Sequence, residues 1–568
     1  MTNYQFTGGT ICAPATIPGT GAISIIRVSG KESLAIADKV IDTKGVPIAE
    51  TDGYRLRYGT VFEADGSVLD NVIVSVFRAP HSYTGENSVE ISCHASRFIV
   101  NKILELLVNA GARIAAPGEF TRRAFVNGKM DLAQAEAVAD VIASQSAASH
   151  RVAMNQLKGG FSSELKVLRE KLLTMTSLLE LELDFSEEDV EFASRKELGQ
   201  LVDDSLTHIR RLTASFSRGN AIKNGVPVAI VGATNTGKST LLNALLGEER
   251  AIVSDIAGTT RDTIEETLNI DGILFRFIDT AGIRETDETI EKIGIDRTFK
   301  KLGEAAVVLG MTDLSRGEAA VLEDADFILS KVNEMDGVKN VAAENDGAET
   351  GGAHLAGTDG ASLAETGGAP RAGTDGTSLA ETGGKPLAET GGASQHGHGD
   401  GQERKVVILV NKCDVAGSFY KDDNGTGCDS GNDLGENRAE IGGNKNVNHN
   451  NNIVSLIENK YDNCKVIPIS AKTGKGLSTL TKTLGEIGSE ITGSTDETLV
   501  TNVRHYEALV RTASALDRVR AGLHIATLPP DLIAQDLREA LYHLGEIVGE
   551  ISTDETLGNI FRNFCIGK

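Results

Sequence analysis

The sequence contains no tryptophan, and aromatic residues make up only 4% of its 568 residues. It has no apolar run near the roughly 20 residues that a membrane-spanning helix needs, so we expect no membrane anchor. The first residues, 1–9, lack both a basic start and an apolar segment, which argues against a signal peptide. The six cysteines show no CxxC spacing. This usage is typical of reduced thiols and predicts a cytoplasmic protein.

The charge balance is strongly acidic, with 80 Asp and Glu against 56 Lys and Arg and a net charge of −24. Such a balance excludes bulk nonspecific adhesion to nucleic acids or anionic membranes. It leaves room for an RNA partner that binds a local basic patch. A chain of this length exceeds what one hydrophobic core usually serves, so we expect about two to four domains.

The domain pattern begins with short β-rich runs and turns, which predict an α+β domain over residues 1–127. Residues 128–221 carry apolar residues at three- and four-residue spacing without proline, and a similar helical pattern returns over 493–568. Because an inserted domain is tolerated where its ends lie close together, we interpret these two segments as one discontinuous helical domain.

The intervening residues, 222–492, alternate strand and helix patterns and predict an inserted P-loop domain with a doubly wound, mainly parallel sheet. Two inserts interrupt it, at about 334–403 and 416–452. The first repeats AETGG and AGTDG and offers too few apolar residues to offset its ordering entropy, so we expect a disordered loop. The expected strands are PVAIVG, LFRFID, AAVVLGM, KVVILVNK and CKVIPIS.

A phosphate-binding loop is predicted at Gly232–Ser239, where GATNTGKS fits GxxxxGK[ST] between a strand and a helix. Its glycines allow successive backbone N–H groups to point at phosphate oxygens beside a helix N-terminus. Lys238 is suited to neutralise the β- and γ-phosphates, and the Ser239 hydroxyl is a hard ligand for Mg²⁺.

Three further motifs follow strands in the order expected of GTP-binding proteins: Asp279–Gly282, Asn411–Asp414 and Ser470–Lys472. Asp414 can accept two hydrogen bonds from guanine that adenine cannot offer, which favours GTP over ATP. Thr260 is expected to be the second Mg²⁺ ligand. The predicted GTP-binding residues are Asn235, Thr236, Gly237, Lys238, Ser239, Thr240, Ser254, Asp255, Ile256, Ala257, Gly258, Thr259, Thr260, Asp279, Thr280, Ala281, Gly282, Asn411, Lys412, Asp414, Ser470, Ala471 and Lys472.

One expected group is missing, because Ile283 stands where small GTPases place a water-orienting glutamine. Hydrolysis must therefore rely on another group and another positive charge. Asn235 in the phosphate loop indicates a monovalent cation site. The alternative is a slow switch that needs a separate activator.

Taken together, these residues resemble the tRNA modification GTPase family MnmE, also called TrmE. The resemblance covers almost the whole chain outside the inserts and is most specific in IAGTTRD (256–262), DTAGIR (279–284), the segment 117–142 and FCIGK (564–568). It implies a dimerising, folate-binding N-terminal domain, a discontinuous helical domain, and a G domain that is activated when two copies pair across the nucleotide. It also implies Glu291 as a catalytic acid, and K⁺ ligands at Asn235, Ser254, Ile256 and Thr259.

The resemblance further implies a reduced-folate site, for 5,10-methylene- or 5-formyl-tetrahydrofolate, with Cys565 as a catalytic thiol near it. Taken from the residues alone, the folate-site positions are more typical of surface ion pairs, and Cys565 can equally be a small buried hydrophobe. Both interpretations stay open at this point. The implied folate-binding residues are Arg27, Glu90, Lys129 and Lys568.

The implied activity is that of a potassium-dependent GTPase using GTP, Mg²⁺, K⁺ and folate. As a homodimer, it would form a heterotetramer with an FAD-dependent, MnmG-like partner. Together they would add an aminomethyl or carboxymethylaminomethyl group at C5 of the wobble uridine of tRNA. The alternative is a regulatory or ribosome-assembly GTPase without one-carbon chemistry. The N-terminal domain together with FCIGK favours the first interpretation.

Overall fold

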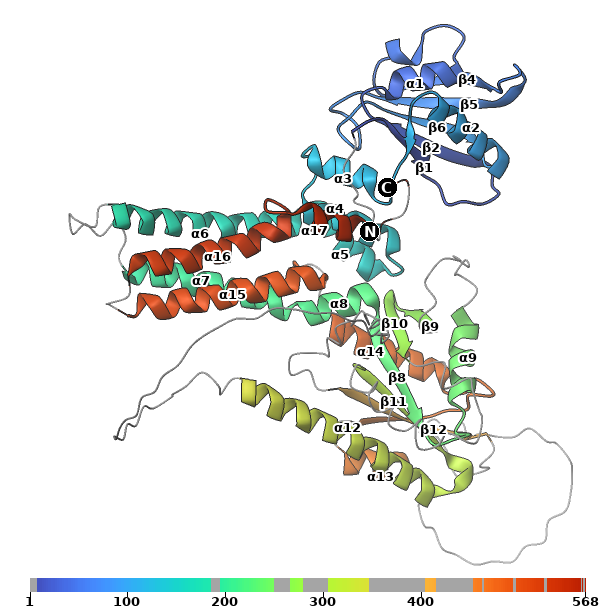
Figure 1. Ribbon diagram of the computed structural model, residues 1–568. Coiled ribbons are helices and arrows are strands. Elements are labelled where there is room, and N and C mark those ends of the chain that lie inside the picture. Colours follow the sequence, from blue (N-terminus) through green and yellow to red (C-terminus); the bar gives the residue numbers. More distant parts are fainter. Residues whose placement is uncertain are drawn as a thin grey trace, which may run out of the picture. The chain divides into compact units, whose positions relative to one another are not determined.

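The structure of the chain is a computed structural model (Figure 1). The contacts within the chain divide it into two compact units. The first unit comprises residues 1–227, 245–277 and 477–568, and the second comprises 228–244 and 278–476. The described residues are 8–184, 195–249, 266–278, 305–346, 404–414, 453–461, 464–493, 497–525, 529–562, 564 and 567.

The N-terminal part of the first unit is a seven-stranded sheet with the order β3-β4-β5-β6-β2-β1-β7. Strand β5 buries every second residue, Asp70, Val72, Val74 and Val76, and the valines share a core with helices α1 and α2, as expected of an α+β domain. The elements are β1 Ile11–Pro14, β2 Ile23–Ser29, α1 Ser33–Val40, β3 Ile41–Asp42, η1 Ile48–Glu50, β4 Arg55–Phe62, β5 Val68–Phe77, β6 Ser88–His94, α2 Arg97–Asn109, β7 Arg113–Ile114 and α3 Glu119–Val126.

The helices of the first unit come from two distant parts of the sequence. Leu172 of α6, Ile209 of α7, Leu516 of α15 and Leu537 of α16 belong to one hydrophobic core, and α15 and α16 lie beside α7 and α6 (Figure 1). No described helix is long and apolar enough to cross a membrane. The helices are α4 Leu132–Ala143, α5 Ala147–Leu157, α6 Gly160–Asp184, α7 Arg195–Ala214, α8 Phe216–Asn224, α14 Leu477–Thr492, α15 Val503–Leu523, α16 Pro530–Val548 and α17 Asp554–Arg562.

The first unit also contains an antiparallel hairpin of β9, Glu266–Ile270, and β10, Ile273–Ile278, whose last residue belongs to the second unit. Asp271 and Gly272 connect the strands with φ values of 52° and 80°, the left-handed backbone typical of a tight hairpin turn. The sequence patterns identified β10 but not β9, because the five residues ETLNI of β9 form only a short, half-buried strand.

The second unit is built on parallel strands in the order β13-β12-β11-β8, which read as continuous apolar runs because both faces are covered. Helix α12 extends to Asp346, beyond the predicted start of the first insert, because this stretch still contains good helix formers. Residues 347–403 and 416–452 lie outside the described residues. The first two residues of β8 and residues 245–249 of α9 belong to the first unit. The elements are β8 Val226–Gly232, α9 Lys238–Glu249, β11 Val307–Asp313, η2 Leu314–Arg316, α12 Glu318–Asp346, β12 Lys405–Asn411, α13 Ile453–Lys460 and β13 Cys464–Pro468.

Candidate functional site

The predicted phosphate loop connects the end of β8 to the start of α9. Gly232 has a φ of 155°, and a Cβ there would lie 2.3 Å from the carbonyl oxygen of Met311. Gly237 has a φ of 98°, and a Cβ there would lie 2.5 Å from Nδ2 of Asn411. Both positions therefore require glycine, because the loop backbone approaches Met311 at the first glycine of the motif and Asn411 at the second.

Lys238 lies at the first position of α9, with its amino group turned back over the loop. The Nζ atom donates to the carbonyl oxygens of Gly232 at 2.9 Å and Ala233 at 2.7 Å. Burial lowers the pKa of this lysine. The positive charge of Lys238 and the positive end of the α9 dipole both lie at the phosphate loop, an arrangement suited to binding a phosphate group.

Asn411 joins the three described motifs of this site. Its Nδ2 donates to the carbonyl oxygen of Thr236 at 2.7 Å, and its Oδ1 accepts from the backbone N–H of Ala471 at 3.0 Å. The side chain is only 3% exposed, and Thr236 and Ala471 are buried as well. The carboxyl ends of β8, β12 and β13 thus meet at one edge, which we call the nucleotide edge: residues 232–239, 411–414 and 470–472.

Asp313 is a residue of this edge that the sequence patterns did not identify. It ends β11, and its Oδ2 lies 2.6 Å from Nζ of Lys412, which adopts a φ of 63°. Although burial raises the pKa of Asp313, hydrogen bonds from Lys412 and Ser315 leave it below its ordinary value. Its place after a parallel strand, like that of Asp414 after β12, is the signal that could have revealed it.

The remaining predicted residues of the site divide into two groups. Ser239 and Thr240 lie in the first turn of α9, Asp414 is half-buried after β12, and Lys472 is exposed beside buried Ser470. Among the described residues, no cluster of His, Cys and acidic side chains could hold a metal ion. Outside the described residues are Ser254, Asp255, Ile256, Ala257, Gly258, Thr259, Thr260, Asp279, Thr280, Ala281, Gly282, Ile283, Glu291, Cys565 and Lys568.

A second polar site surrounds Arg27, which faces Glu90 across the paired strands β2 and β6. Arg27 donates to Oε1 of Glu90 from Nε at 2.9 Å and from Nη2 at 2.8 Å, and its Nη1 lies 3.4 Å from the carbonyl oxygen of Gly567. Its guanidinium lies 5.1 Å from the ring centre of Tyr83 and 5.7 Å from that of Phe120. We call these five residues the Arg27 site.

Contacts of Phe561 and of Gly567 place the C-terminal segment next to this site. Phe561 packs in a cluster with Leu132 and Ala135, and its ring centre lies 5.2 Å from that of Phe564. Gly567 has a φ of 97°, and a Cβ there would lie 2.0 Å from the carbonyl oxygen of Pro14.

Lys129, which the family resemblance implies as a folate-binding residue, donates from Nζ to the carbonyl oxygen of Pro80 at 3.1 Å.

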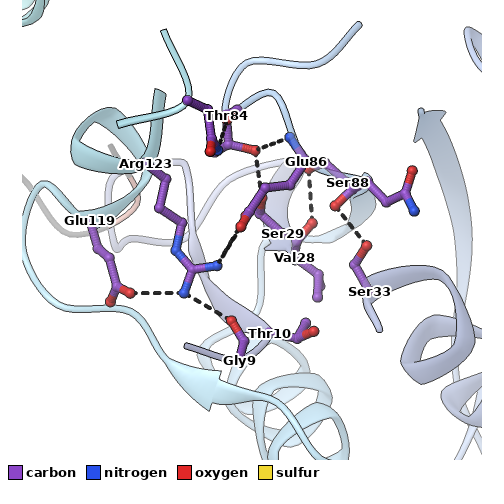
Figure 2. Close-up of polar contacts among 12 residues, drawn as sticks. Gly9, Thr10, Val28, Ser29, Ser33, Thr84, Glu86, Ser88, Glu119 and Arg123 are labelled. Carbon is purple, nitrogen blue, oxygen red and sulfur yellow. Dashed lines mark hydrogen bonds and ion pairs between the residues drawn. The ribbon is translucent and has the colours of Figure 1, made fainter. Parts of the chain in front are cut away.

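A buried arginine, Arg123, contacts the loop before β6, and Figure 2 shows its contacts with Glu86 and Glu119. The side chain of Arg123 is only 2% exposed and lies 3.0 Å from carboxylate oxygens of both Glu86 and Glu119. It also donates to the carbonyl oxygen of Gly9 at 2.9 Å. Glu86 also accepts a hydrogen bond from the Ser29 hydroxyl at 2.9 Å. This network joins β2, α3 and the loop before β6, and the sequence patterns did not predict it.

The described geometry has a phosphate loop that opens a helix on a parallel sheet, with Asn-Lys-x-Asp and Ser-Ala-Lys segments at neighbouring strand ends. These features define the chain as a P-loop GTP-binding protein.

Comparison with known proteins specifies the family. Residues 10–129 match the family model described as GTP-binding protein TrmE N-terminus, and residues 132–565 match the model of the MnmE helical domain. The tRNA modification GTPase MnmE of Parabacteroides distasonis is 43% identical over 562 residues, covering 98% of this chain and 100% of that protein. The MnmE of Bacteroides fragilis is 44% identical over 561 residues, covering 98% and 99%. The chain belongs to the MnmE family of tRNA modification GTPases, which confirms the resemblance in its motifs.

Proposed function

We propose that this protein is a cytoplasmic, potassium-dependent GTPase that acts in tRNA modification. The observation that supports this most directly is the nucleotide edge, where Asn411 connects the phosphate loop to the two segments expected to bind guanine. The relatives named tRNA modification GTPase, which align over nearly the whole chain, supply the biological context.

At the nucleotide edge, Lys238 and the N-terminus of α9 bind the phosphates, and Asp414 with the Ser470–Lys472 segment binds guanine. The phosphate loop fits GTP, because Gly232 and Gly237 have positive φ values and no side chain, a backbone suited to close approach to phosphates. The oxygens of Ser239 and Thr260 suit Mg²⁺. Asn235, Ser254, Ile256 and Thr259 hold K⁺, which supplies the charge that an arginine supplies elsewhere, while Glu291 orients the attacking water.

The Arg27 site is proposed to hold the reduced folate. An arginine between two aromatic rings fits a flat ring system with an anionic tail, and Glu90 can hydrogen-bond a pterin. Lys129 and Lys568 complete the site, and Cys565 acts near it in the modification. With an FAD-dependent, MnmG-like partner in a heterotetramer, the protein modifies C5 of the wobble uridine of tRNA with an aminomethyl or carboxymethylaminomethyl group.

The homodimer is proposed to form through the N-terminal sheet. Tyr58 pairs with Ile73 across β4 and β5, and Leu56 lies on the same face two residues earlier. Leu56 is 68% exposed, Tyr58 66% and Ile73 47%. A contiguous apolar face of this kind is typical of a surface that a second protein covers.

Two measurements test the proposed function. Mass analysis of wobble uridine from cells lacking the protein should show loss of the modification, and GTP turnover of the purified protein should be much faster in K⁺ than in Na⁺ at equal ionic strength. A ribosome-assembly GTPase would leave the uridine unchanged. Equal turnover in the two salts would contradict the cation site.

A further inference from the structure

A groove of about 840 Å³ lies along α5 in the first unit. Its lining includes Ser146 at the N-terminus of α5, His150, Arg151 and Asn155 on the helix, and Lys158 at its end. Asn269 of the β9–β10 hairpin forms another wall. We call this feature the α5 groove.

Hydrogen bonds hold the walls of the α5 groove together. Nδ2 of Asn269 donates to the carbonyl oxygen of Gln145 at 2.9 Å. The backbone N–H of Ala148 in the first turn of α5 lies 3.4 Å from the carbonyl oxygen of Gly272 in the hairpin turn. The groove is therefore formed between two elements that contact each other.

The charge of the α5 groove is opposite to that of the whole chain. Of the 568 residues, 80 are Asp or Glu, yet none occurs between Asp140 and Glu164. None of the described residues that line the groove is acidic, whereas Arg151 and Lys158 both line it. The N-terminus of α5, at Ser146, adds the positive end of a helix dipole at the opposite end of the helix from Lys158. In a protein with a net charge of −24, such a local patch is where a polyanion can bind.

We propose that the α5 groove binds the phosphate backbone of tRNA, an inference that rests on the proposed function in tRNA modification. Arginine, lysine, serine and amide side chains are among the groups that contact phosphate and sugar oxygens in protein–DNA complexes, and RNA presents the same phosphate groups. The described lining contains no Phe, Tyr or Trp, and the imidazole of His150 is the one ring in it on which a base could stack. The groove therefore recognises the backbone rather than the base sequence, and it uses none of the residues predicted to bind GTP or folate.

The test is tRNA binding by the full-length double variant Arg151→Gln/Lys158→Gln, measured by fluorescence anisotropy across a series of NaCl concentrations at constant KCl. We expect the affinity to fall about tenfold, and the slope of log affinity against log salt to become shallower by roughly 1.4 to 1.8, as for the loss of two phosphate contacts. GTP turnover without tRNA should stay unchanged, because neither residue belongs to the nucleotide edge.

The matched control is Arg511→Gln/Lys171→Gln, which removes one exposed arginine and one exposed lysine from α15 and α6 outside the groove. It should bind tRNA like the wild type, and the conservative variant Lys158→Arg should retain binding. Wild-type affinity and salt slope in the groove variant would overturn the inference while leaving the proposed function intact. Loss of affinity for the flavoprotein partner, with tRNA binding unchanged, would also overturn it. No tRNA binding by the wild type, alone or with its partner, would instead count against the proposed function.

Discussion

The nucleotide edge and the Arg27 site are assembled in different ways. At the nucleotide edge, each motif is a short contiguous segment that follows a parallel strand, and one side chain, Asn411, connects them. At the Arg27 site, single residues from β2, β6, the preceding loop, α3 and the C-terminal segment meet. The first kind of site depends on local backbone shape, whereas the second depends on the packing of the whole domain.

The largest effect is expected from breaking the packing that supports the Arg27 site. Arg123→Met removes the buried partner of Glu86 and Glu119, while Glu119 keeps its ion pair with Arg113, so the free energy of unfolding of the N-terminal domain should fall by about 3 kcal/mol, the lower end of the range for a broken buried pair. Denaturant unfolding measures this change. The control Arg97→Met alters an exposed arginine at the start of α2 and should have little effect. A similar result for both variants would show that the network does not stabilise the domain.

The second effect concerns the connection at the nucleotide edge. Asn411→Ala leaves the buried carbonyl of Thr236 and N–H of Ala471 without their partner, at about 1–3 kcal/mol for each group. GTP affinity should fall at least tenfold, and XTP affinity should fall with it. Asp414→Asn should instead change the preference from GTP to XTP. Nucleotide titrations distinguish the two, and retained GTP preference in Asp414→Asn would mean that the guanine contact is misplaced.

A third prediction separates the two sites by function. Arg27→Gln removes the guanidinium that contacts Glu90 and Gly567, so binding of 5-formyl-tetrahydrofolate should weaken about tenfold, while GTP turnover in K⁺ stays normal. Lys39→Gln, an exposed lysine on α1, serves as the control. Isothermal titration with the folate measures the affinity. An unchanged folate affinity would remove Arg27 from the proposed site.

The smallest effect is expected from deleting residues 347–400, between the end of α12 and β12. The repeats there offer too few apolar groups to form a core, so melting temperature and GTP turnover should stay near those of the full chain. Thermal unfolding and a turnover assay are sufficient. A drop of several degrees would show that the insert packs against the second unit.

The parts of the molecule that were predictable from sequence are those with a local signature. The glycines at positions 232 and 237 belong to a contiguous loop motif, and the apolar runs mark buried parallel strands. Arg123 could not be identified in this way, because its ion pairs and hydrogen bond form only when folding brings Glu86, Glu119 and Gly9 together around it. Asp313 has a local signal in its place at the end of a parallel strand, but its pairing with Lys412 could not be predicted, because the two residues lie 99 positions apart in the sequence. Family resemblance supplied Arg27 and Glu90, and their pairing across β2 and β6 became visible only with the register of the sheet.

The contact between Arg27 and Gly567 has a consequence for how the protein is made. The two residues are 540 positions apart, so the strand that carries Arg27 leaves the ribosome long before the segment that completes its surroundings. Chains generally fold domain by domain, starting at the N-terminus, as synthesis proceeds. The N-terminal sheet therefore forms first with this side open, and the Arg27 site is completed only after translation has passed residue 567. A truncated chain released early would contain the whole nucleotide edge and an incomplete Arg27 site.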